Sequence, residues 1–144
     1  MVETAALQLT DEAFIVEFEN LTLDPTHFSH YGHLRLAWLY LMNYDVETAI
    51  EKVCTGIKAY AESLGANTKF NLTMTDAITR IIADRMNRMR VKEWDLFLEQ
   101  NEDLVEDVFS VLDIYFSREL LMSEEARLDL VVPDRKQLPI CNRN

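Results

Sequence analysis

The sequence predicts one all-α domain: a bundle of four main helices with one or two short ones and an extended C-terminal arm. Three observations support this fold class. The chain has 144 residues, 49% of them hydrophobic, which suffices for one substantial core. Three glycines and three prolines are too few turn-formers for a many-stranded sheet. In several segments, apolar residues recur at the three-and-four spacing of a helix.

Capping residues predict where the first two helices begin. Thr10 is followed by two acidic residues, which favour the positive end of a helix, so we expect a short helix over residues 11–20. Asp24 and Pro25 form a second pair of cap and first-turn residues. The second helix is therefore expected to start there and to run to about Tyr44.

The next two helices are predicted from their apolar stripes. Asp45 is an N-cap, and the stripe behind it continues to Leu64 and ends at Gly65. A fourth amphipathic run extends from Met74 toward Met89. Together they predict two long helices in the middle of the chain.

The C-terminal third is predicted to hold shorter elements. A short helix is expected around Trp94, then a longer one that starts at Asn101 and passes through Tyr115, and the segment SEEARL adds a last turn. Residues 129–144 contain two prolines and adjacent valines, which disfavour helix, so we expect an extended arm that packs across the bundle. Residues 1–9 are expected to be a flexible N-terminus.

Charge and composition remove several classes of function. The 25 acidic and 14 basic residues give a net charge of -11, which repels nucleic-acid phosphates, so no nucleic-acid partner is expected. The longest apolar stretch is about half of a membrane span, so no membrane partner is expected. Cys54 and Cys141 lie far apart and form no ligand pair, which favours a reduced, cytoplasmic protein.

The histidines are the first candidate for a functional site. All three, His27, His30 and His33, recur every third residue at the start of a predicted helix. Residues three apart are neighbours on a helix, and His30 and His33 lie above an apolar face, so both are expected to point toward the core. Three interpretations remain open: a weak site for a divalent transition metal, a polar cluster satisfied by the protein itself, and a small-molecule pocket.

Arg35 is the residue least expected in this apolar helix. A buried guanidinium needs a carboxylate partner, or else it faces an anionic ligand. The two interpretations are a salt bridge to a neighbouring helix and an anchor for a carboxylate or phosphate near the histidines.

Three segments carry a resemblance: HFSHYGHLRLAWLYL, GANTKFNLTMT and FSRELLMSEEARLDLVVPDRKQLP. They resemble a family of small uncharacterised bacterial helical proteins with an F-x-H-x-x-H-L motif, a Tyr-His-Glu-Thr-x-Thr segment and a Ser-x-x-Ala-Arg, Pro-Asp, Leu-Pro ending. The resemblance implies the fold and no assigned activity. It also implies that the midway histidine and glutamate accompany the pair matching His30 and His33. This chain has Asn71 and Leu72 there instead, and neither is a good metal ligand.

No catalytic motif accompanies these residues. The chain has no glycine-rich phosphate loop and no Gly-x-Ser-x-Gly elbow, so the sequence leaves open whether it is an enzyme. The first hypothesis is a protein that binds a small molecule or a weak metal at a pocket of His30, His33, Arg35 and Asn71. The alternative is a non-catalytic interaction or accessory protein, acting as a homodimer or as a partner subunit.

Overall fold

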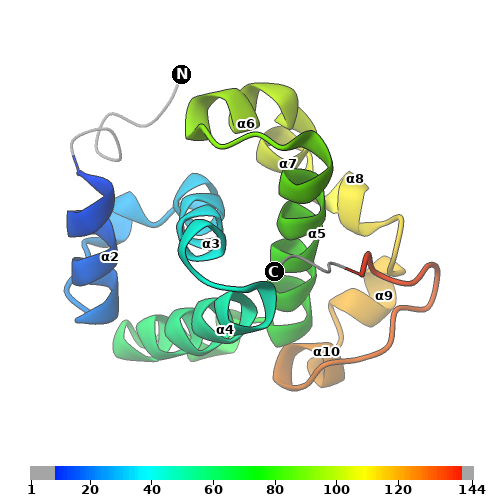
Figure 1. Cartoon of the computed structure of the whole chain (residues 1–144). Coiled ribbons are helices and arrows are strands. Elements are labelled where there is room, and N and C mark those ends of the chain that lie inside the picture. The colour runs from blue at the N-terminus through cyan, green and yellow to red at the C-terminus, as the bar shows by residue number, and fades with distance from the viewer. Residues whose placement is uncertain (1–8, 141–144) are drawn as a thin grey trace.

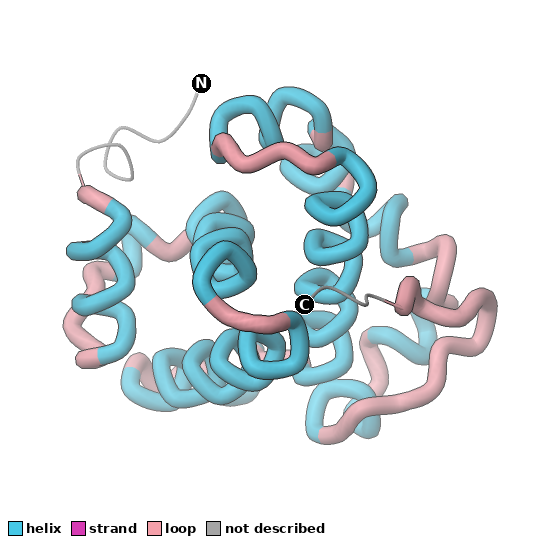
Figure 2. Tube along the Cα trace, viewed as in Figure 1, coloured by secondary structure: helices cyan, strands magenta, loops and turns pink. Residues whose placement is uncertain are grey.

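A computed structural model describes residues 9–140, and every regular element in that range is helical (Figure 2). The predicted all-α class is therefore confirmed. The longer helices are α2 (Asp11–Glu19), α3 (His30–Asn43), α4 (Val46–Ser63), α5 (Leu72–Met89) and α6 (Trp94–Gln100). The shorter ones are α7 (Glu102–Glu106), α8 (Val108–Leu112), α9 (Arg118–Leu121) and α10 (Glu124–Leu128), with 3-10 turns η1 (Pro25–His27) and η2 (Asn67–Lys69).

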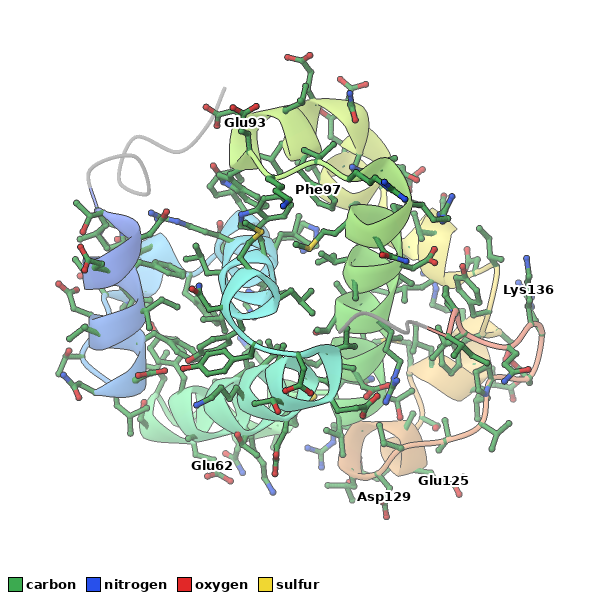
Figure 3. All side chains as sticks on the ribbon, in the orientation of Figure 1. Glu62, Glu93, Phe97, Glu125, Asp129 and Lys136 are labelled. Carbon is green, nitrogen blue, oxygen red and sulfur yellow. The ribbon has the colours of Figure 1, made fainter. Side chains whose placement is uncertain are left out.

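Helix α3 is the central element of the bundle. Figure 1 shows α2, α4, α5 and the α6–α7 pair arranged around it, and α8 to α10 on the outer side of α5. Eight of its 14 residues are buried, as the nearly continuous apolar sequence predicts. Phe97 of α6, labelled in Figure 3, packs its ring 4.8 Å from that of Trp38 on α3. Exposed acids such as Glu62 and Glu93 lie on the outside.

Several predicted boundaries are confirmed by cap geometry. The hydroxyl of Thr10 accepts a hydrogen bond from the backbone N–H of Ala13, and the carboxylate of Asp45 accepts one from Thr48. Gly65 follows α4 with φ of 71°, a left-handed conformation that favours glycine. Short-range chemistry was sufficient at these positions.

The predicted start of the second helix is wrong. Asp24 does cap a turn, accepting from the backbone N–H of Thr26, but that turn is only η1. The chain then bends, and α3 begins at His30 with Ser29 as its N-cap residue. A Cβ on Gly32 would lie 2.5 Å from the carbonyl oxygen of His27, so the bend needs glycine at this position. His27 consequently lies outside the helix that carries the other two histidines.

The prediction of one helix from Asn101 through Tyr115 is also wrong. This segment forms two short helices, α7 and α8. The backbone of Asp107, with φ of -149° and ψ of 51°, interrupts the helix between α7 and α8. Helix α9 was not predicted, so the described part of the chain holds more short helices than the one or two expected.

The C-terminal arm is confirmed as far as residue 140, and it packs on the bundle. The hydroxyl of Thr73 in α5 donates to the carbonyl of Asp129 and accepts from the N–H of Val131. Residues 141–144, and residues 1–8 of the predicted flexible N-terminus, lie outside the described residues. Leu9, the last residue of that predicted segment, packs on the core, and its carbonyl accepts a hydrogen bond from Arg35.

None of the helices within residues 9–140 has the length and apolar character needed to cross a membrane.

Candidate functional site

His30, His33 and Asn71 line the same pocket, whose volume is about 540 Å³. The histidines come from the first turn of α3, and Asn71 is the N-cap residue of α5. Both helices therefore begin at the pocket, and Figure 1 shows α10 beside α5, against which it packs. The volume falls in the range typical of small-molecule sites.

The rest of the lining combines an apolar wall with a few polar groups. Apolar side chains come from three helices and two connecting segments: Leu34, Ile57, Phe70, Met74, Ile78 and Met122. Thr68 and Lys69 of η2, Thr75 of α5 and Arg127 of α10 add polar groups. This mixture suits a ligand that has both an apolar body and a polar group.

The two histidines are each held by a backbone carbonyl. The imidazole Nε2 of His30 lies 2.8 Å from the carbonyl oxygen of Leu104, and Nδ1 of His33 lies 2.8 Å from that of Ser29. A carbonyl oxygen only accepts, so both nitrogens donate. When neutral, His30 keeps an acceptor at Nδ1 and His33 keeps one at Nε2. One of the interpretations was a polar cluster whose hydrogen bonds are made within the protein. It holds for one ring nitrogen of His30 and one of His33.

Burial lowers the pKa of the His33 imidazole below its ordinary value, and the nearby His30 acts in the same direction. The hydrogen bond to the carbonyl of Ser29 opposes this shift, because it stabilises the protonated ring. The net effect keeps His33 neutral at physiological pH.

His27 does not take part in the pocket. It lies on η1, outside α3, and it is not among the lining side chains. Its Nδ1 is buried and has no hydrogen-bond partner in the described structure. The even spacing of the three histidines therefore has no structural counterpart, because the bend before Ser29 separates the first from the other two.

Asn71 combines a capping role with its place in the pocket. Its side-chain oxygen accepts from the backbone N–H of Met74, and its amide nitrogen donates to the carbonyl of Leu121. The first contact begins α5 and the second ties α5 to α9. From the sequence, Asn71 was considered only as the residue that replaces the histidine of the resembled family. Its role as the N-cap of α5 was not predicted.

Arg35, predicted as a ligand-binding residue, does not lie at the pocket. Its guanidinium donates to the carboxylate of Asp11 at 2.8 Å and to the carbonyl of Leu9 at 2.9 Å. Its terminal carbon also lies 4.6 Å from the ring centre of Phe14. The structure therefore matches the salt-bridge interpretation, with the partner on α2, and corrects the placement of Arg35 beside the histidines.

The interpretation of the histidines as a weak metal site finds no ligand set in the described residues. Within residues 9–140, no group of three or more histidine, cysteine, aspartate or glutamate side chains is arranged to hold a metal ion. His30 and His33 each use one ring nitrogen for a carbonyl, and the pocket lining contains no carboxylate or thiolate to complete a set.

Sequence reasoning missed Lys69 and Arg127 as pocket residues. Arg127 belongs to the Ser-x-x-Ala-Arg motif quoted above, and the structure explains each of its positions. The hydroxyl of Ser123 caps α10, Ala126 is fully buried, and Arg127 reaches the carbonyl of Asn67 as well as the pocket. That motif was the signal that could have drawn attention to Arg127.

No family model, no curated protein and no solved structure matches the chain, so the resemblance stays a prediction.

Proposed function

We propose that this protein binds a small organic molecule in the pocket between the starts of α3 and α5. The supporting observation is that His30, His33 and Asn71, which are distant in sequence, line one cavity of about 540 Å³. The apolar wall favours an organic ligand over a bare ion. In its neutral form each of the two imidazoles offers one acceptor nitrogen, which gives a ligand a directional contact.

A pocket-filling substitution tests the proposal. Met74 lines the pocket, whereas Met42 is 40% exposed near the other end of α3 and does not line it. Met74→Trp is expected to occupy the cavity, and Met42→Trp is the matched control. Small organic fragments are screened by NMR, with the backbone amides of Asn71 and Thr75 as reporters.

The expected result is at least one fragment that shifts these amides in the native protein and in Met42→Trp, but not in Met74→Trp. Fragments that bind equally well to all three proteins, or that shift only distant amides, would count against the pocket as the binding site.

A second candidate function is self-association through the C-terminal segment. Leu128, Leu130 and Val132 are 61%, 56% and 83% exposed, so three apolar side chains face solvent within five residues. Charges of both signs, Asp129 and Arg127, lie beside them. In a two-fold symmetric dimer the same segment of both copies forms the contact. The apolar side chains would then cover each other, and Asp129 of one copy could face Arg127 of the other.

Solution mass tests the second candidate. Val132→Asp is compared with Val16→Asp, since Val16 is also exposed, at 54%, but lies on α2. Light scattering across a concentration series is expected to show a dimer that Val132→Asp disrupts and Val16→Asp does not. A constant mass of 16.8 kDa, that of one chain, would exclude the homodimer.

A further inference from the structure

The charge of the pocket lining is opposite to that of the chain. Acidic residues outnumber basic ones by 25 to 14 overall. None of the thirteen side chains that line the pocket is acidic, yet two are cationic, Lys69 and Arg127, and two are imidazoles. The lining is therefore more favourable to an anion than the acidic surface of the rest of the chain.

Lys69 is the less neutralised of the two cations. It is exposed, at the end of η2, and it forms no ion pair with a carboxylate among the described residues. Its charge is therefore available to a ligand at the pocket.

Arg127 is positioned by other contacts. It pairs with Glu124, which is itself 70% exposed, and it donates to the carbonyl of Asn67. The N-terminal ends of α3 and α5 also lie at this pocket, and the positive ends of their helix dipoles have the same sign as the two cations. A cationic ligand or a metal cation would meet these positive charges at a disadvantage.

The apolar wall defines the rest of the ligand. Three side chains of this wall come from α4 and α5: Ile57, Met74 and Ile78. Met74 and Ile78 are half-buried, whereas Ile57 is buried. An inorganic anion would leave this surface in contact with water, whereas an aliphatic or aromatic body would cover it.

Given the small-molecule binding proposed above, we infer that the ligand is an amphiphilic organic anion. Its carboxylate lies beside Lys69 and Arg127, and its apolar body covers the wall formed by α4 and α5. A monocarboxylate with a medium-length alkyl chain has this chemistry.

Three probes with the same chain length separate charge from apolar contact: octanoate, 1-octanol and octylammonium. Binding to the full-length protein is followed by the shifts of the Asn71, Met74 and Thr75 amides. Octanoate is expected to bind most tightly. Raising the salt concentration from about 0.01 M to about 1 M shortens the screening length roughly tenfold and should weaken octanoate while leaving 1-octanol unchanged.

Lys69→Gln removes one charge without a described ion pair, and Lys92→Gln is the matched control in the loop that follows α5 at its other end. Lys69→Gln is expected to weaken octanoate binding by about three- to fivefold, the scale of a partly exposed ion pair, and Lys92→Gln should have no effect.

The outcomes separate the two proposals. If 1-octanol or octylammonium binds at these amides as tightly as octanoate does, or if Lys69→Gln leaves octanoate affinity unchanged, the anionic ligand class is wrong and the pocket stands. If none of the three probes shifts these amides, and no fragment in the NMR screen shifts them either, the proposed small-molecule function fails as well.

Discussion

His30 and His33 are hydrogen-bonded to backbone carbonyls through different ring nitrogens. His30 donates from Nε2 to the carbonyl of Leu104 in α7, whereas His33 donates from Nδ1 to that of Ser29, one turn earlier in the chain. The neutral rings therefore have opposite tautomers. One histidine joins α3 to α7, and the other is tied to the start of its own helix.

The first prediction concerns these tautomers. In long-range ¹H–¹⁵N NMR spectra at about pH 8, where imidazoles are neutral, His30 should show the Nε2–H form and His33 the Nδ1–H form. His30→Ala and His33→Ala assign the signals. Identical tautomers for the two rings would contradict the hydrogen bonds described.

The second prediction is a pH dependence of stability. Burial lowers the pKa of His33 in the folded protein below its ordinary value of 6.5, so the unfolded chain binds the proton more readily. The free energy of unfolding should be highest above pH 6.5 and should fall as pH drops through the folded pKa.

His33→Gln is the variant for this measurement, because it removes the titration and keeps an amide that can donate to a carbonyl. Urea unfolding between about pH 7.5 and 5 should show a shallower loss of stability in His33→Gln than in the native protein. Parallel curves would show that His33 does not carry the effect.

The third prediction separates the two side-chain hydrogen bonds of Asn71, the cap of α5 and the contact with Leu121. Asn71→Ala removes both the cap of α5 and the contact with Leu121, and it should lower the free energy of unfolding by about 1–2 kcal/mol. Asn71→Asp keeps a capping oxygen and should cost less, because only the amide donor is lost. Equal losses in urea unfolding would mean that the cap contributes little.

The fourth prediction concerns Arg35 and its partner. Arg35→Ala removes a buried guanidinium that packs on Phe14, and it should cost about 1–3 kcal/mol. Asp11→Asn should cost about 1 kcal/mol or less, because Asp11 is 65% exposed and an amide oxygen still accepts.

Ligand affinity provides a further measurement on the Arg35 variant. Because Arg35 does not line the pocket, Arg35→Ala should lower thermal stability and leave octanoate binding unchanged at a temperature where the variant is folded. A selective loss of octanoate affinity would place Arg35 in the ligand site after all.

The fifth prediction addresses the bend before α3. Gly32→Ala places a methyl group 2.5 Å from the carbonyl oxygen of His27, so the backbone must move, at a cost of about 1–3 kcal/mol. Gly65→Ala is a comparison with open space around the added carbon but a positive φ, and it should cost about 1 kcal/mol. Thermal unfolding should rank Gly32→Ala as the more damaging change.

Local chemistry explains why much of the fold was predictable. The caps at Thr10 and Asp45 and the stop at Gly65 depend on neighbours within a few residues, and all three occur where expected. The bend at Ser29 and the break at Asp107 were not predicted. The bend goes with the close approach of Gly32 to the carbonyl of His27, and the break goes with the backbone conformation of Asp107. Apolar spacing alone reveals neither.

The candidate site was predictable only in part. Helical periodicity correctly grouped His30 with His33, since both line the pocket, but His30 is exposed and His33 is only half-buried, so the prediction that both point toward the core was too strong. The resemblance brought Asn71 into consideration. The even spacing of the histidines also put His27 beside His30, and the sequence-based hypothesis put Arg35 in the same pocket, whereas neither residue lines it. Lys69 and Arg127 were missed because η2 and α10 meet only in three dimensions.

By itself, then, the sequence determined the helical class, the apolar character of the helix that carries His30 and His33, and the negative net charge, since each follows from composition or from spacing along the chain. Only the tertiary structure decided which polar groups share a pocket. Arg35 pairs with Asp11 on α2 and does not line the pocket. Arg127, which lies 94 residues after His33 in the sequence, lines the same pocket as His33. The physical reason is that packing of distant helices, and not sequence spacing, selects the partners of a buried or half-buried polar side chain.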